Sequence, residues 1–91
     1  MTSRKIYYEL EKVFKGVSNH RRLEVLFLLN TQPNLSTDDI VEKLNINYQT
    51  GSQHIRKLVG AGLVSTHRKG SAVLHVLSPL GVKVLYFSKN I

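Results

Sequence analysis

The amino-acid sequence predicts an α+β fold that is mainly helical. Apolar residues recur at helical spacing over most of the chain, which favours helices. A single pair of short segments flanks Gly70-Ser71, which is typical of a β-hairpin. The length of 91 residues suffices for one core but not for two, so we expect a single domain over residues 1–91.

The amino-terminal third predicts two helices. The first extends from Ser3 to Gly16, where the glycine favours a stop. The second begins with Ser18 as its N-cap and runs to about Asn30, before "TQPN" breaks it. Its second half is apolar nearly all round, so we expect this helix to be the most buried element.

The next two predicted helices are short and closely joined. Ser36 or Thr37 caps the first, and two acids follow in its opening turn, where the helix dipole favours them. Asn45 stands where a helix would end in a left-handed residue. Asn47 then caps a helix over about Tyr48–Gly60. Two short helices joined by so tight a turn predict a helix-turn-helix.

The rest of the chain predicts a hairpin and a closing helix. Segments Val64–Lys69 and Ala72–Leu77 are the two strands, with glycine first in the turn between them. Ser78 and Pro79 supply the N-cap and the first residue of the last helix. The predicted order is therefore four helices, a hairpin and a fifth helix.

Charge is unevenly distributed along the chain. Up to Leu44 there are seven Lys or Arg residues and six Asp or Glu, whereas residues 45–91 hold six Lys or Arg and no acid. A surface without carboxylates suits a polyanion, and nucleic acid is the leading candidate. The alternatives are an anionic membrane surface, an acidic protein, or a basic surface that serves only solubility.

Composition excludes several classes of protein. The chain has no cysteine, which rules out disulfides and thiolate metal sites. The longest apolar run, Val25–Leu29, is too short to span a membrane, and the amino terminus lacks a signal-peptide core. We therefore expect a cytoplasmic location. The chain has no phosphate-cradling glycine loop, and its basic half has no carboxylate pair. We therefore expect that the protein is not an enzyme and needs no cofactor.

Three motifs carry a resemblance that extends over nearly the whole chain: "SNHRRLEVLFLL", "LSTDDIVEKLNINYQTGSQHIRKLVGAGLV" and "STHRKGSAVLHVLSPLG". Together they resemble the winged helix-turn-helix regulators of the ArsR type, and more loosely of the MarR type. The resemblance implies a winged helix-turn-helix with a two-stranded wing and terminal helices, double-stranded DNA as partner, and transcriptional regulation, with repression the simplest mechanism. Winged helices also serve as protein–protein or RNA-binding modules, so both alternatives stay open.

The helix over Tyr48–Gly60 is the candidate reading helix. An α-helix fits the major groove, where Gln can pair with adenine and Arg with guanine. If Ile55, Leu58 and Val59 face the core, the polar residues face outward, although a merely solvated face is the alternative. The predicted DNA-binding residues here are Tyr48, Gln49, Thr50, Ser52, Gln53, Arg56 and Lys57.

Gly51 lies near the start of this candidate reading helix. Counting back from Ile55 and Leu58 places it on the inner face. A glycine inside a helix costs about 1 kcal/mol relative to alanine. Either the preceding helix packs unusually close, near Ile40 or Leu44, or slack remains behind the helix. We favour close packing.

The tip of the hairpin is a second predicted DNA-binding region. A basic tip can follow the DNA backbone or enter the minor groove. Hairpin tips are commonly polar, so an ordinary solvated turn is the alternative. The predicted residues of this wing are His67, Arg68, Lys69 and Ser71.

The terminal segments 1–17 and 79–91 carry more apolar surface than one face can hide. In the resembling families the terminal helices form a two-fold dimer, which pairs with palindromic half-sites. The alternative is a monomer whose terminal helices close its own core. The predicted interface residues are Ile6, Tyr7, Leu10, Phe14, Leu80, Val84, Leu85 and Phe87.

Many regulators of the ArsR type bind metal, but the cysteine pairs that hold it are absent here. The last helix also lacks the family's acidic and histidine cluster. Pairing around the turn puts Thr66 opposite His75, so His67 and His75 point to opposite faces. His20 and His54 are interpreted as polar or half-buried structural residues, and we expect no metal site.

Overall fold

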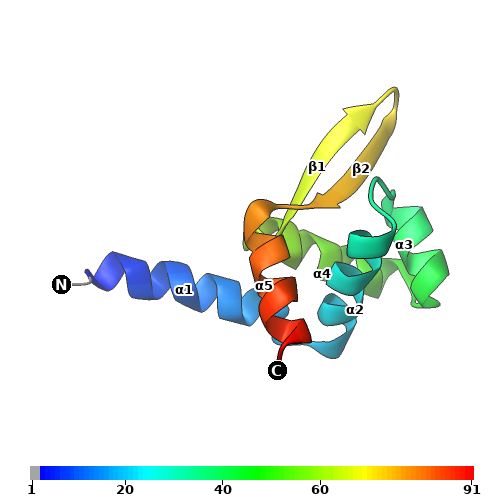
Figure 1. The fold of residues 1–91 in the computed structure, drawn as a ribbon. Helices are drawn as coiled ribbons and strands as arrows, with labels where there is room; N and C mark the ends of the chain where they lie inside the picture. The colour runs from blue at the N-terminus through cyan, green and yellow to red at the C-terminus, as the bar shows by residue number, and fades with distance from the viewer. Residues whose placement is uncertain (1–2) are drawn as a thin grey trace.

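The computed structural model describes residues 3–91 and shows five helices and one two-stranded sheet in that part of the chain (Figure 1). It confirms the predicted mainly helical α+β fold. Met1 and Thr2, which the predicted terminal segment 1–17 includes, lie outside the described residues. The elements are α1 (Arg4–Val17), α2 (His20–Thr31), α3 (Thr37–Leu44), α4 (Tyr48–Gly60), β1 (Val64–Lys69), β2 (Ala72–Leu77) and α5 (Pro79–Lys89).

The junction between α1 and α2 differs from the prediction. Gly16 does not end α1 but is buried inside it, where an added Cβ would come within 2.6 Å of the Cβ of Ala61. The N-cap of α2 is Asn19, whose side chain accepts two backbone hydrogen bonds at 2.8 and 3.3 Å. Ser18 is instead the C-cap of α1. The glycine is thus explained by a close approach to α4 and not by a helix stop.

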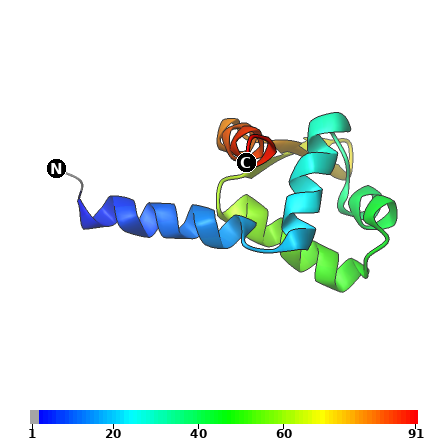
Figure 2. The ribbon, with the colours of Figure 1, turned by 60° about the horizontal axis from the view of Figure 1, so that its bottom comes forward.

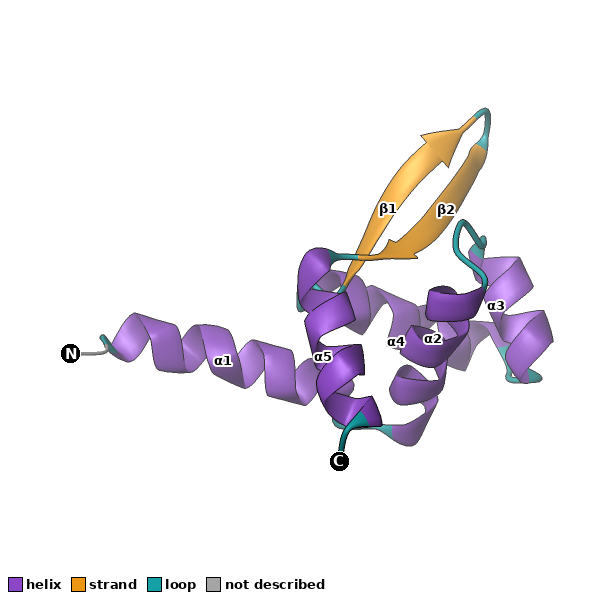
Figure 3. Ribbon diagram, viewed as in Figure 1, coloured by secondary structure: helices purple, strands orange, loops and turns teal. Residues whose placement is uncertain are grey.

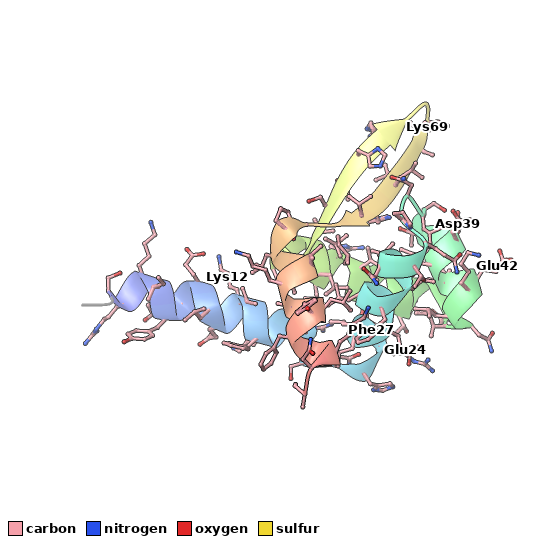
Figure 4. The ribbon with its side chains drawn as sticks, viewed as in Figure 1. Lys12, Glu24, Phe27, Asp39, Glu42 and Lys69 are labelled. Carbon is pink, nitrogen blue, oxygen red and sulfur yellow. The ribbon has the colours of Figure 1, made fainter. Side chains whose placement is uncertain are left out.

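The core gathers around α2, which contributes Val25, Leu26 and Leu29 and packs against α1, α3, α4, α5 and β2. The other buried members come from every remaining element except α1 and β2, and from the loop after α4: Ile40, Ile55, Leu58, Leu63, Val64 and Leu85. Burying such a side chain contributes about 1.5–3 kcal/mol. With three of the nine buried core residues, α2 agrees with the expectation of the most buried element, although its Phe27 is exposed (Figure 4).

The helix-turn-helix is held by the caps that the sequence predicts. Ser36 accepts a hydrogen bond from the backbone N–H of Asp39 at 3.1 Å, and the Asp39 carboxylate accepts one from the Ser36 N–H at 3.1 Å. This capping box fixes the start of α3. Asn45 is left-handed, with φ of 53°, and Asn47 caps α4. The tight turn therefore rests on three local side-chain preferences.

Gly51 is buried where α4 crosses α3. An added Cβ would overlap Cγ1 of Val41 and would lie 3.0 Å from Cδ1 of Ile46. Close packing behind α4 is thus confirmed, but against Val41 and Ile46 and not the predicted Ile40 or Leu44.

The wing is an antiparallel hairpin that extends beyond the helices (Figure 3). Gly70 in its turn has φ of 63°, a conformation that glycine adopts readily. The predicted pairing of Thr66 with His75 is confirmed. Leu35, before α3, adds a short bridge to β2 at His75, whose backbone N–H donates to the Leu35 carbonyl at 2.8 Å. The base of the wing is therefore joined to the helix-turn-helix.

The last helix begins as predicted, with Ser78 accepting a hydrogen bond from the Gly81 N–H at 2.9 Å. Gly81 packs so closely on Leu63 that an added Cβ would overlap its carbonyl oxygen. This contact turns Leu85 inward, where it is only 3% exposed and belongs to the core. No helix within residues 3–91 is long and apolar enough to cross a lipid bilayer.

Candidate nucleic-acid interface

The structure separates α4 into an inner and an outer face. Ile55 and Leu58 are buried and Val59 packs against the core, as predicted. Ser52 is half-buried, and the other candidate residues of the reading helix are exposed: Tyr48, Gln49, Thr50, Gln53, Arg56 and Lys57. The outer face of α4 is thus free within the protomer to meet a ligand.

The first turn of α4 is fixed by Asn47. Its side-chain oxygen accepts hydrogen bonds from the backbone N–H groups of Gln49, at 2.8 Å, and Thr50, at 3.2 Å. Further along, the Arg56 guanidinium donates to the Ser52 hydroxyl at 3.4 Å. This contact one turn back aims Arg56 along the helix toward its N-terminus, the end that enters a groove in a helix-turn-helix complex.

The wing and α4 lie next to each other at the base of the hairpin. A shallow hollow of about 230 Å³ has Ser52 and Arg56 on one side and Thr66 of β1 on the other. Arg68, Lys69 and Ser71 lie beyond it near the hairpin turn, and Lys69 marks the tip in Figure 4. The base of the wing therefore lies beside α4, while the predicted wing residues lie farther out toward the tip of the hairpin (Figure 1).

His67 has a partner that the sequence does not reveal. Its Nε2 lies 2.7 Å from the side-chain oxygen of Asn34, in the loop between α2 and α3. Asn34 has a positive φ of 66° and its backbone N–H donates to the His75 carbonyl at 3.0 Å. His67 thus joins this loop to the wing, in addition to any contact with a ligand.

Arg22 at the start of α2 is a positioned cation that sequence reasoning missed. Its guanidinium donates to the carbonyls of Lys15, at 2.9 Å, and Gly16, at 3.4 Å, and its Nε donates to Nδ1 of His54 at 3.2 Å. Burial lowers the pKa of His54, and the positive charges of Arg22, His20 and Arg21 lower it further. A neutral His54 is the form that accepts this hydrogen bond.

The terminal helices expose an apolar groove. It has a volume of about 460 Å³ and lies between α1, α2 and α5, with Phe14 and Phe87 64% and 65% exposed beside it. Ile6, Tyr7 and Leu10 are exposed further out on α1. Leu80 and Val84 are half-buried against the protomer's own core. The buried Leu85 cannot reach a partner, because α5 turns it inward, and it does not belong to a dimer interface.

Within the described part of the chain, no three His, Asp, Glu or Cys side chains lie close enough together to hold a metal ion. His20 is exposed and His54 is half-buried against Arg22. His75 is buried, with Nδ1 2.8 Å from the Leu35 carbonyl. His54, His67 and His75 thus each contact a different protein group.

Comparisons with known proteins agree with this geometry. The family model described as "Bacterial regulatory protein, arsR family" matches residues 19–66, more than half of the chain. The transcriptional repressor SdpR of Bacillus subtilis is 33% identical over 69 residues, which are 76% of either chain. A cadmium resistance regulator, a CadC homologue of Staphylococcus aureus, is 27% identical over 85% of this chain and 64% of its own length.

A solved structure is similar over almost the entire chain. It is the homodimeric winged helix-turn-helix DNA-binding domain of a possible ArsR-family regulator from Mycobacterium bovis. The TM-score is 0.82 at 26% identity, and the match covers 99% of this chain and 84% of that one. The chain belongs to the ArsR family of bacterial regulatory proteins.

Proposed function

We propose that this chain is a transcriptional regulator that binds double-stranded DNA as a homodimer and recognises a specific sequence. One observation carries the proposal: the exposed outer face of α4 begins at a capped N-terminus and lies beside a basic wing. From Asn45 to the end, no carboxylate repels a phosphate. The Asp39 and Glu42 carboxylates lie on α3 instead (Figure 4).

The reading helix and the wing have different roles in this proposal. Gln53 and Arg56 on α4 contact base edges in the major groove, because their side chains can form two hydrogen bonds to adenine and guanine respectively. The other α4 candidates and the wing contact phosphates, which fix the register but carry no sequence information. Those positioning residues are Tyr48, Gln49, Thr50, Ser52, Lys57, His67, Arg68, Lys69 and Ser71.

The chain acts as one domain whose terminal segments 1–17 and 79–91 form the dimer. The exposed apolar side chains of α1 and the groove beside Phe14 and Phe87 support this pairing, since a second copy would bury them. A two-fold dimer presents two copies of α4 to two half-sites. Binding over a promoter would exclude the transcription machinery, so repression in the cytoplasm, without a metal or cofactor, is the simplest mode of action.

Binding to DNA selected by the wild-type chain from a random duplex pool tests the proposal. Gln53→Ala and Arg56→Ala should weaken binding to the selected duplex much more than binding to a scrambled one. Binding to an RNA duplex of the same sequence distinguishes DNA recognition from an RNA-binding function. A-form RNA has a narrow major groove that side chains cannot read, so the proposed DNA reader should bind this RNA duplex much more weakly. Equal binding of wild type and both variants to the selected duplex would reject α4 as the reading helix.

Two neighbouring tyrosines on α1 provide a matched test of the dimer. Tyr7 and Tyr8 are 61% and 67% exposed, but only Tyr7 lies on the apolar stripe with Leu10 and Phe14. Tyr7→Asp should shift the chain toward a monomer in analytical ultracentrifugation, whereas Tyr8→Asp should leave the dimer intact. If both variants sediment like the wild type, α1 is not at the interface.

A further inference from the structure

A second basic surface lies beside the predicted reading helix. A cleft of about 500 Å³ opens where the end of α1 and the start of α2 meet the second half of α4. Five of its eight lining residues are basic: Lys12, Lys15, Arg22, Arg56 and Lys57. The sequence predicts only the last two of these as ligand contacts, so three cations from α1 and α2 have no assigned role.

Small residues form the remaining wall of this basic cleft: Gly16, Gly60 and Ala61. Gly16 brings α1 against Ala61, and no other side chain approaches Gly60 within 4 Å of an added Cβ. The cations therefore surround an open space with no large side chain among the other lining residues. Such a space gives a phosphate group direct access to several positive charges at once.

Arg22 differs from the lysines of the basic cleft because hydrogen bonds to the protein hold its side chain. Its three hydrogen bonds to Lys15, Gly16 and His54 hold the guanidinium in one place. A fixed guanidinium loses little conformational entropy when it meets a phosphate, which favours binding. Burial is the largest cause of the lowered pKa of His54, and the nearby positive charges of Arg22, His20 and Arg21 lower this pKa further.

Lys15 lies on the side of α1 away from its exposed apolar stripe, so a dimer formed through that stripe leaves it accessible. Lys12 lines the basic cleft and also a neighbouring hollow that Ile6 and Leu10 of the stripe share. Lys15 forms an ion pair with Glu11 at 3.2 Å, but both side chains are largely exposed. Exposed pairs contribute little, so Lys15 can exchange this partner for a phosphate. Glu9 lines a neighbouring hollow and not the basic cleft.

We propose that the basic cleft binds backbone phosphates of the same DNA duplex that α4 reads. The inference rests on the proposed function and extends the DNA contact from α4 and the wing to α1 and α2. Arg56 links the two regions, because it lines both the basic cleft and the hollow beside the wing. Figure 2 shows α1 and α4 along the same edge of the molecule, so one ligand can follow both helices.

The lining chemistry favours the DNA backbone over bases or a small anion. Lysine is a point charge that suits phosphate and selects no base. The two cations that α4 contributes to the basic cleft, Arg56 and Lys57, also line a further shallow hollow beside Gln53. Five cations from three helices can contact more than one phosphate, whereas a single small anion would meet only some of them.

The test compares Lys12→Ala/Lys15→Ala with Lys43→Ala, which removes an exposed lysine in the last turn of α3, outside both the basic cleft and the terminal segments. Binding of the full chain to its selected duplex is measured by fluorescence anisotropy over a range of salt concentrations. Each phosphate that the double variant no longer binds should flatten the slope of log K against log salt by about 0.9. The preference of this variant for the selected over a scrambled duplex should stay unchanged, and Lys43→Ala should behave like the wild type.

The result distinguishes this inference from the proposed function. If the wild type binds the selected duplex and the double variant has the same salt slope, the cleft does not contact DNA, although the proposed function stands. If the wild type shows no sequence preference, the proposed function itself fails. Calorimetric titration with tripolyphosphate tests whether the basic cleft binds a small free anion instead. The proposal is overturned in favour of such an anion if the wild type binds tripolyphosphate, the double variant does not, and the salt slope of DNA binding is the same for both.

Discussion

Replacing Gly51 with alanine tests the packing inside the helix-turn-helix. Alanine favours a helix interior over glycine by about 1 kcal/mol, so propensity alone predicts stabilisation. In the structure, however, the new methyl group would overlap Cγ1 of Val41 and press on Ile46. Valine in a helix is nearly confined to one rotamer, so Val41 cannot simply turn away.

The overlap should outweigh the gain in propensity. Forcing an extra carbon into a packed core costs about 1–3 kcal/mol. Gly51→Ala should therefore lower the free energy of unfolding by up to about 2 kcal/mol, measured by urea denaturation at fixed protomer concentration. Gly60→Ala is the matched control, because Gly60 is also in α4 and nothing lies within 4 Å of its added Cβ.

A double-mutant cycle with Val41→Ala isolates the contact. In the Val41→Ala background, Gly51→Ala should lower the free energy of unfolding by less than it does in the wild type, because the valine methyl groups that it would overlap are gone. This difference is the coupling energy between the two neighbouring sites. The reasoning fails if Gly51→Ala stabilises the chain as much as Gly60→Ala does. That outcome would show slack behind α4.

Four further variants have expected outcomes. Arg56→Ala should cost about 1–3 kcal/mol of binding free energy for the specific duplex and relax the choice of sequence. Lys69→Ala should weaken binding to all duplexes alike and flatten the slope of log K against log salt by about 1. Gel-shift titrations measure both effects. Ser36→Ala removes one arm of the capping box and should cost about 1 kcal/mol of unfolding free energy in urea, and no change would mean that the cap contributes nothing. The pKa of His54 is lowered from 6.5, so the unfolded chain binds more protons, and stability should fall as the pH drops below 6.5. His54→Gln should reduce that fall in urea titrations at several pH values, and an unchanged pH dependence would exclude His54 as a source.

Local side-chain chemistry explains why so many elements could be predicted. The bounds Tyr48–Gly60 follow from a cap at Asn47 and the apolar spacing after it, both encoded within a few residues. The hairpin register follows from the turn at Gly70, since the turn determines which residues pair. The outward face of α4 was predictable for the same reason, because helical periodicity fixes which side chains share a face.

Contacts between distant segments could not be predicted in this way. The local sequence predicts a helix stop at Gly16, but the glycine is needed because Ala61, at the end of α4, packs against it. Arg22 and His54 are 32 residues apart, so the local sequence around either residue does not predict their hydrogen bond. The same holds for the basic cleft, which residues of α1, α2 and α4 form together. In α5 apolar residues occur all around the helix, so their spacing does not show which face is buried. The packing of Gly81 on Leu63 decides that Leu85 turns inward.

Selection of bound sequences from random duplex DNA tests the central claim most directly. A homodimer with one reading helix in each protomer predicts enrichment of a palindromic motif. Its half-sites should be centred about one helical turn apart, roughly 10–10.5 base pairs, or a multiple of that spacing. Failure to enrich any motif would contradict sequence-specific DNA binding and would favour a winged helix that binds another protein.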